Sequence, residues 1–183
     1  MPVDARARDA ARARGGDDLD AWVAAVSGGA ATPRARVIST ADAEVLRTAL
    51  AGRDGGEPMS VGEVALAVDT GRELAGRAAA RGVHVVVATA ANGASDAAAE
   101  VLSDALAAPG GHGPLGALRR LGDAPIAVLC GVALGAGEHG LGCVCDGPAA
   151  AAGAAVAAAI EPDLGPRLLL RDAGAVLGRL ERA

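Results

Sequence analysis

Two strand-to-helix junctions decide how this chain is expected to fold. The first is Val83-His84-Val85-Val86-Val87-Ala88, which runs into Thr89-Ala90-Ala91-Asn92-Gly93-Ala94-Ser95-Asp96 and then an alanine-rich helix. The second is Leu141-Gly142-Cys143-Val144-Cys145, which runs into Asp146-Gly147-Pro148 and another alanine-rich helix. Repeated strand, short turn and helix build a parallel sheet with ligand pockets at the carboxyl ends of its strands. The sequence therefore predicts an α/β fold, a parallel Rossmann-like sheet flanked by helices in three layers.

The other elements follow from hydrophobic periodicity and capping signals. Residues 34–39 and 167–170 are predicted strands. The predicted helices are 19–26, 42–51, 60–80, 96–107, 115–121, 125–134, 148–160 and 173–182. Ser60 and Glu63 have the spacing of a capping box, which indicates a well-defined start for the 60–80 helix. Residues 1–32 are expected to form an N-terminal arm, a frayed tail with a short helix, and residues 33–183 the α/β domain.

Composition and charge exclude several classes of function. The net charge is −5, and the only cluster of basic residues, Arg6 to Arg14, has no aromatic partners, so nucleic-acid binding is not expected. No apolar run of about 18 residues free of charge and glycine is present, so no membrane span is predicted. The absence of an export signal and the odd count of three cysteines favour the cytoplasm.

The first junction is a candidate anion site. Thr89, Asn92, Gly93 and Ser95 are the candidate phosphate- or nucleotide-binding residues, because helix amides would point at this loop and glycine permits close backbone approach. Either Ser95 or Asp96 is expected to cap the following helix. The alternative is an ordinary capped loop, and the Asp96 carboxylate would repel a phosphate.

The second junction offers a carboxylate at the end of a predicted central strand. Asp146 and Gly147 are candidate base-pocket residues, because ligand contacts in such folds lie at carboxyl strand ends. The alternative role for Asp146 is to cap the helix that Pro148 opens.

Three other motifs are interpreted as structural. Gly135-Ala136-Gly137-Glu138-His139-Gly140 has the spacing of a dinucleotide fingerprint, but it follows a helix and precedes a strand, so helix termination is the preferred interpretation. Cys143 and Cys145 are predicted to be small core residues, and no metal site is expected. No histidine has a position that predicts a Cys–His catalytic pair.

The order of five segments resembles the nicotinate-nucleotide–dimethylbenzimidazole phosphoribosyltransferase family. The similar segments are, in order, 34–39, 58–75, 82–99, 121–136 and the segment from Asp146-Gly147 into its alanine-rich helix. The resemblance covers roughly residues 33 to 182. It implies transfer of phosphoribosyl from nicotinate mononucleotide to a benzimidazole-type base, a step in cobalamin lower-ligand activation, with no cofactor.

The departures from the family pattern fall on the chemistry. Ala90 stands where the family's loop has an acid, and Pro125 where another motif has glutamate. Residues 40–43 lack the histidine of the family's first-strand motif, and the family's catalytic glutamate is expected beyond the end of this chain. The family is expected to be close to twice as long.

These departures leave three functions open. The chain is a phosphoribosyltransferase with weak or lost activity and no assigned catalytic base, a non-catalytic partner or degenerate paralogue of such an enzyme, or a generic nucleotide-binding α/β module. The expected assembly is a homodimer or a complex with a full-length homologue.

Overall fold

The computed structural model describes residues 3–13, 17–43, 57–91, 95–108, 113–171, 174, 177 and 181–182. Its helices and short 3-10 turns, in chain order, are α1 (Ala5–Ala13), α2 (Asp18–Val26), η1 (Thr40–Asp42), α4 (Val61–Ala79), α5 (Asp96–Ala107), α6 (Pro114–Leu121), α7 (Ala124–Glu138), α8 (Pro148–Ile160) and η2 (Pro162–Arg167). None of the described helices is both long enough and apolar enough to cross a membrane.

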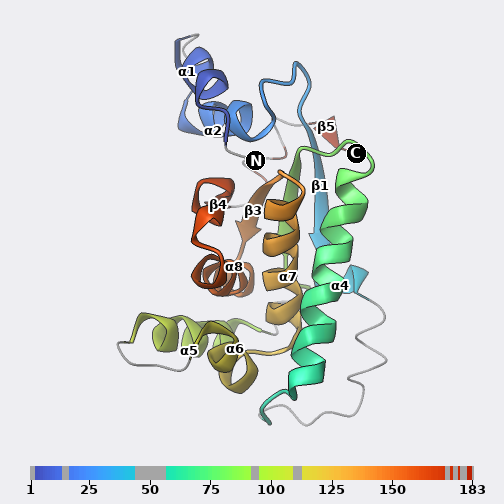
Figure 1. Ribbon diagram of the computed structural model, residues 1–183, viewed down its shortest axis with the longest axis vertical. Helices are drawn as coiled ribbons and strands as arrows, with labels where there is room; N and C mark the ends of the chain where they lie inside the picture. Colours follow the sequence, from blue (N-terminus) through green and yellow to red (C-terminus); the bar gives the residue numbers. More distant parts are fainter. Residues whose placement is uncertain are drawn as a thin grey trace.

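The sheet has the parallel arrangement that the sequence predicts (Figure 1). Its spatial order is β4-β3-β2-β1-β5, and every described pairing is parallel. The strands are β1 (Arg34–Ser39), β2 (Val85–Thr89), β3 (Gly142–Asp146), β4 (Leu168–Leu170) and β5 (Glu181–Arg182). The predicted α/β class and parallel sheet are confirmed.

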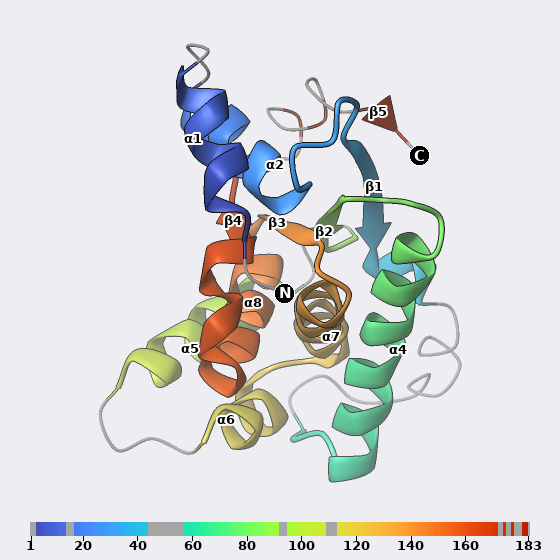
Figure 2. The same ribbon diagram turned by 45° about the horizontal axis from the view of Figure 1, so that its top comes forward.

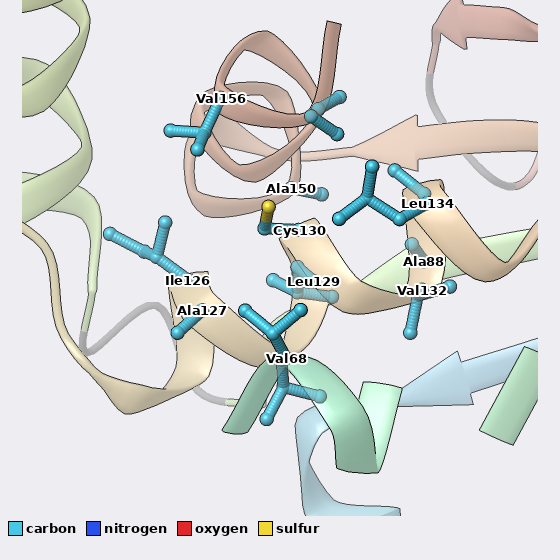
Figure 3. Packing of buried hydrophobic residues seen from close by; sticks show 14 of the residues in the cluster. Val68, Ala88, Ile126, Ala127, Leu129, Cys130, Val132, Leu134, Ala150 and Val156 are labelled. Carbon is cyan, nitrogen blue, oxygen red and sulfur yellow. The ribbon is translucent and has the colours of Figure 1, made fainter. Parts of the chain in front are cut away.

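Three helices, α4, α7 and α8, cover one face of the sheet (Figure 2). Figure 3 shows α7 between the other two, with Val68 of α4 on one side and Val156 of α8 on the other. The largest side chains that are less than 2% exposed anywhere in the described chain are Ile, Met, Leu and Val, so the layers must approach closely to exclude water. Glycines make the contact of α4 with α7 possible. A Cβ atom on Gly71 would lie 2.1 Å from the Val128 carbonyl oxygen, and one on Gly131 would lie 2.0 Å from that of Val68.

The opposite face is covered by α2, which completes the three layers. Leu19, Val23 and Val26 of α2 pack with Val85 and Val144 of the sheet. The Trp22 indole also joins this contact, and its Nε1–H donates to the Pro166 carbonyl at 3.1 Å. A half-buried aromatic side chain whose polar atom has a hydrogen-bond partner anchors this short helix to the rest of the protein.

The N-terminal tail was predicted to be frayed, but it contains the helix α1, which packs beside α2. The Asp4 carboxylate accepts hydrogen bonds from the backbone N–H groups of Arg6 (2.9 Å) and Ala7 (3.1 Å). This side chain satisfies amides of the first turn that would otherwise lack partners, which explains why so short a segment is helical.

Other predicted boundaries need correction. Glu181 and Arg182 form a strand paired with β1, so the predicted helix 173–182 is wrong at its end, because pairing at the open edge of β1 prevails over local helix preference. Asp42 lies in the 3-10 turn η1, whereas 44–51 of the predicted 42–51 helix lie outside the described residues. Helix α7 continues to Glu138, past the predicted end at 134, and Gly140 at φ +72° follows it.

Candidate functional site at the carboxyl edge

Three polar side chains form a row at the carboxyl edge of the central strands. The register pairs Ser39 of β1 with Thr89 of β2, and Thr89 with Asp146 of β3. All three residues are half-buried. Because side chains alternate along a strand, the three lie on the same sheet face as α2, opposite α7. The preceding residues on that face are Val37, Val87 and Val144, which give the row an apolar floor.

The turn that follows β1 supplies further polar groups, which sequence reasoning did not select as site residues. The Ser39 hydroxyl accepts from the Ala41 N–H at 3.2 Å, and the Asp42 carboxylate accepts from the Ser39 N–H at 2.9 Å. The Thr40 hydroxyl accepts from the Ala91 N–H at 2.9 Å. These bonds fix the turn and attach it to the loop after β2. The capping-box spacing of Ser39 and Asp42 was the available sequence signal.

The predicted phosphate-binding residues are partly placed. Thr89 ends β2 in the polar row, and Ser95 immediately precedes α5. Asn92 and Gly93 lie outside the described residues. The predicted cap of α5 is wrong for Ser95, which occupies the N-cap position but makes no side-chain cap hydrogen bond, and Asp96 is already the first helical residue. Ser95 is only 2% exposed, and its φ of −101° with ψ of 5° departs from the extended backbone that capping serines adopt.

The predicted base-pocket residues are both placed at the end of β3. Gly147 is the N-cap residue of α8, at φ +89°, a backbone conformation that favours glycine. No side chain caps α8, so the alternative role of Asp146 as a helix cap is wrong. Within the part of the chain that the structure describes, the Asp146 carboxylate has no hydrogen-bond or ion-pair partner. A half-buried carboxylate that makes no hydrogen bond or ion pair within the described chain is available to bind a ligand.

The helices that directly follow β2 and β3 differ from α4 and α7 at their first turns. Helices α4 and α7 begin with side-chain caps, in which Ser60 accepts from the Glu63 N–H (3.2 Å) and Asp123 from the Ile126 N–H (3.0 Å). Helices α5 and α8 begin without such a bond. Their first-turn amides therefore remain as donors at the edge where Thr89 and Asp146 lie, which suits an anionic or carbonyl group.

The cysteines have the structural role that was predicted. Cys143 and Cys145 are buried in the core between the sheet and its helices, with their Sγ atoms 4.0 Å apart. The hydrogen bond with Cys145 and burial hold the pKa of the Cys143 thiol well above its usual value. Thiols in this state are protonated and poor nucleophiles.

The fold and this edge define a parallel α/β protein with a candidate ligand site at the carboxyl strand ends. Residues 88–176 match the family model described as phosphoribosyltransferase, and this stretch contains Thr89, Ser95, Asp146 and Gly147. The match is in agreement with the resemblance inferred from the sequence and extends over slightly less than half of the chain.

Two solved structures support the same fold. The structure of nicotinate-nucleotide–dimethylbenzimidazole phosphoribosyltransferase from Thermus thermophilus is similar with a TM-score of 0.69 and 20% identity, over 91% of this chain and 81% of that chain. A structure of CobT from the same organism gives 0.63 and 20%, over 82% and 74%. A search of curated proteins found no match. At this identity the likeness establishes the fold.

Proposed function

We propose that the carboxyl edge binds nicotinate mononucleotide together with a benzimidazole-type base. The observation that carries this proposal is the aligned row of Ser39, Thr89 and Asp146, in which the carboxylate has no partner in the described chain. Thr89 and the amides at the start of α5 suit the phosphate, and Asp146 with Gly147 suits the base. The family match over 88–176 supports a phosphoribosyltransferase-like role for this edge.

The transfer would be slow. In this reaction a ring nitrogen of the base attacks C1′ of the ribose, the bond from C1′ to nicotinate breaks, and the proton of the base nitrogen passes to an acceptor. Ala90, at the family's acid position, cannot accept that proton. Asp42 already accepts from the Ser39 N–H, which leaves Asp146 as the available carboxylate described in this row. Alignment of the two substrates then supplies most of the rate enhancement.

A binding experiment tests the first half of the proposal. Isothermal titration with nicotinate mononucleotide should give saturable heat for the native chain and weaker binding for Thr89→Val, which keeps the side-chain shape but removes the hydroxyl. Asp104→Ala, an exposed carboxylate near the far end of α5, is the matched control and should bind as the native chain does. Absence of heat with the native chain would contradict the proposal.

A second assay separates an enzyme from a non-catalytic relative. The replacement of two family acids by Ala90 and Pro125 favours the degenerate paralogue as the second candidate. Nicotinate mononucleotide and 5,6-dimethylbenzimidazole are incubated with the purified chain, and the ribosylated product is followed by chromatography. Product above the protein-free rate supports weak transfer, whereas nucleotide binding without product supports the paralogue. Stabilisation by other nucleotides, with none by this pair, would indicate a generic nucleotide-binding module.

We also propose that the chain acts as a homodimer or in complex with a full-length homologue. The second arrangement would let a partner supply the proton acceptor that Ala90 and Pro125 no longer provide. Light scattering after gel filtration, alone and with the homologue, distinguishes a dimer, a mixed complex and a monomer.

The three cysteines support a cytoplasmic location. Cys130, Cys143 and Cys145 are free thiols, and all three are buried. Unpaired thiols persist where the compartment is reducing. Cell fractionation tests this location.

A further inference from the structure

A cavity lies at the edge of the sheet opposite the candidate site, where the central strands begin. It has a volume of about 630 Å³, within the range of pockets that hold small organic ligands. The first residues of α1, the end of α2, the start of β2 and the segment from α7 to β3 line it. This cavity shares no described lining residue with the carboxyl-edge site.

One wall of the cavity carries a buried cation. The Arg167 side chain is 6% exposed, and its Nη1 donates to the Gly140 carbonyl at 2.7 Å, which anchors the guanidinium beside the loop that leads into β3. Burial lowers the pKa of Arg167 from its ordinary value, but an arginine keeps its charge. A charge held in a protein wall interacts more strongly with an anion than an exposed charge does.

Two histidines line the same cavity. The His84 Nδ1 atom accepts from the Arg34 N–H at 3.2 Å, so in the neutral ring Nε2 carries the proton and is a donor. His139 is exposed at the end of α7 and lines the same cavity. His84 therefore presents an N–H donor whether its ring is neutral or charged.

The remaining lining residues determine the net charge of the cavity and provide its apolar surface. Arg6 of α1 adds a second positive charge, and Asp4 is the one carboxylate among the described lining residues. The Asp4 carboxylate already accepts hydrogen bonds from two backbone N–H groups of α1, so its negative charge is directed toward the first turn of that helix. The apolar side chains in the wall are those of Val3, Val26, Val83 and Leu141.

We propose that this amino-edge cavity binds a small organic anion, a phosphate monoester or a carboxylate with an apolar group, through Arg167, Arg6 and His84. The charged end lies against the guanidinium groups, and the apolar end lies against the valines and Leu141. The chain has a net charge of −5, so a cation-rich cavity is not a consequence of overall composition.

The probe is phenyl phosphate, titrated by calorimetry and by NMR chemical shifts of the backbone amides. Saturable binding should shift the amides of His84 and His139 and leave those of Thr89 and Asp146 unchanged. Benzoate replaces the phosphate by a carboxylate, inorganic phosphate removes the apolar group, and benzyl alcohol removes the charge. Benzoate should bind, and the last two should bind more weakly than phenyl phosphate.

Arg6→Gln tests the charge without disturbing the core, because this side chain is exposed. It should weaken phenyl phosphate binding roughly tenfold, the usual effect of losing a hydrogen bond to a charged group. Arg8→Gln, on the same helix but outside the lining, should bind as the native chain does. The proposal is overturned by absence of saturation, by shifts at Thr89 and Asp146 in place of His84, or by equal binding of Arg6→Gln and the native chain. Binding of nicotinate mononucleotide is measured separately, so either site can fail alone.

Discussion

The Thr40 hydroxyl lies 2.9 Å from the backbone nitrogen of Ala91 and accepts its hydrogen bond, although the two residues are 51 positions apart. The bond joins the turn after β1 to the loop after β2, beside the row of Ser39 and Thr89. Thr40 is therefore a positioning residue, which holds the start of the predicted phosphate loop against the neighbouring strand.

Thr40→Val should weaken nicotinate mononucleotide binding several-fold and lower the free energy of unfolding by about 1 kcal/mol, since the half-buried Ala91 N–H loses its acceptor. Thr40→Ser keeps the hydroxyl and should restore binding. Urea unfolding and calorimetry measure both effects. The matched control is Thr70→Val on α4, whose hydroxyl donates to the Leu66 carbonyl at 2.7 Å within its own helix. If Thr40→Val and Thr70→Val bind the nucleotide equally, the positioning role is wrong.

Gly71→Ala should destabilise the fold by about 1–3 kcal/mol or more, because an added methyl group meets the backbone of α7 and forces α4 away. Gly131→Ala, on the other helix, should have a similar effect, and the double variant should cost less than the sum, since one helix displacement relieves both clashes. Urea unfolding at neutral pH measures the three differences.

Gly62→Ala is the control for this crossing. Gly62 lies in the first turn of the same helix, and an added Cβ there meets no atom within 4 Å. This variant should be neutral or more stable by about 0.4–1 kcal/mol, because alanine restricts the unfolded chain. Equal losses at Gly62 and Gly71 would show that the close approach of α4 and α7 does not determine the effect.

The helices and strands that the sequence predicted correctly are those whose local sequence signals are sufficient to specify them. The buried valines of β2 and the capping box of Ser60 and Glu63 specify strand and helix without reference to the rest of the chain. β5 could not be predicted, because two residues, Glu181 and Arg182, become a strand only through pairing with β1. Helix α7 passes its predicted end because Gly135 and Gly137 lie against α4 and Leu164, contacts that no local pattern records.

The sequence predicted which strand ends carry the site residues, but not which of these residues lie side by side. The positions of Thr89 and Asp146 at strand ends follow from their sequences, whereas the alignment of Ser39 with Thr89 depends on the register between β1 and β2. The roles assigned to caps were the least predictable part. Ser95 has the residue type of a cap but makes no cap bond, because capping requires an extended backbone that this residue does not adopt.

The stability of the protein should fall as pH rises above 9, in part through Cys130. Burial raises the pKa of this thiol from 9.0 to about 12. Between these values the unfolded chain loses the thiol proton and the folded chain keeps it, so the contribution of Cys130 is fully present below pH 9 and is lost toward pH 12. Urea unfolding at about pH 7.5 and about pH 10.5 measures the slope. Cys130→Ala should flatten it, with the remaining decrease carried by Cys143, whose pKa is also raised. Parallel slopes for the native chain and Cys130→Ala would contradict this assignment.

Asp146→Ala should leave the free energy of unfolding within about 0.5 kcal/mol of the native value, because this carboxylate caps no helix and has no partner in the described chain. Asp123→Ala provides the contrast. Asp123 caps α7 by accepting from the Ile126 N–H, and its loss should cost about 1 kcal/mol. The two variants should rank the other way round in dimethylbenzimidazole binding, measured by calorimetry with nicotinate mononucleotide present. Asp146→Ala should bind the base more weakly than the native chain, and Asp123→Ala should bind it as the native chain does. A stability loss at Asp146 as large as that at Asp123, with unchanged binding, would assign Asp146 a structural role and remove it from the base pocket.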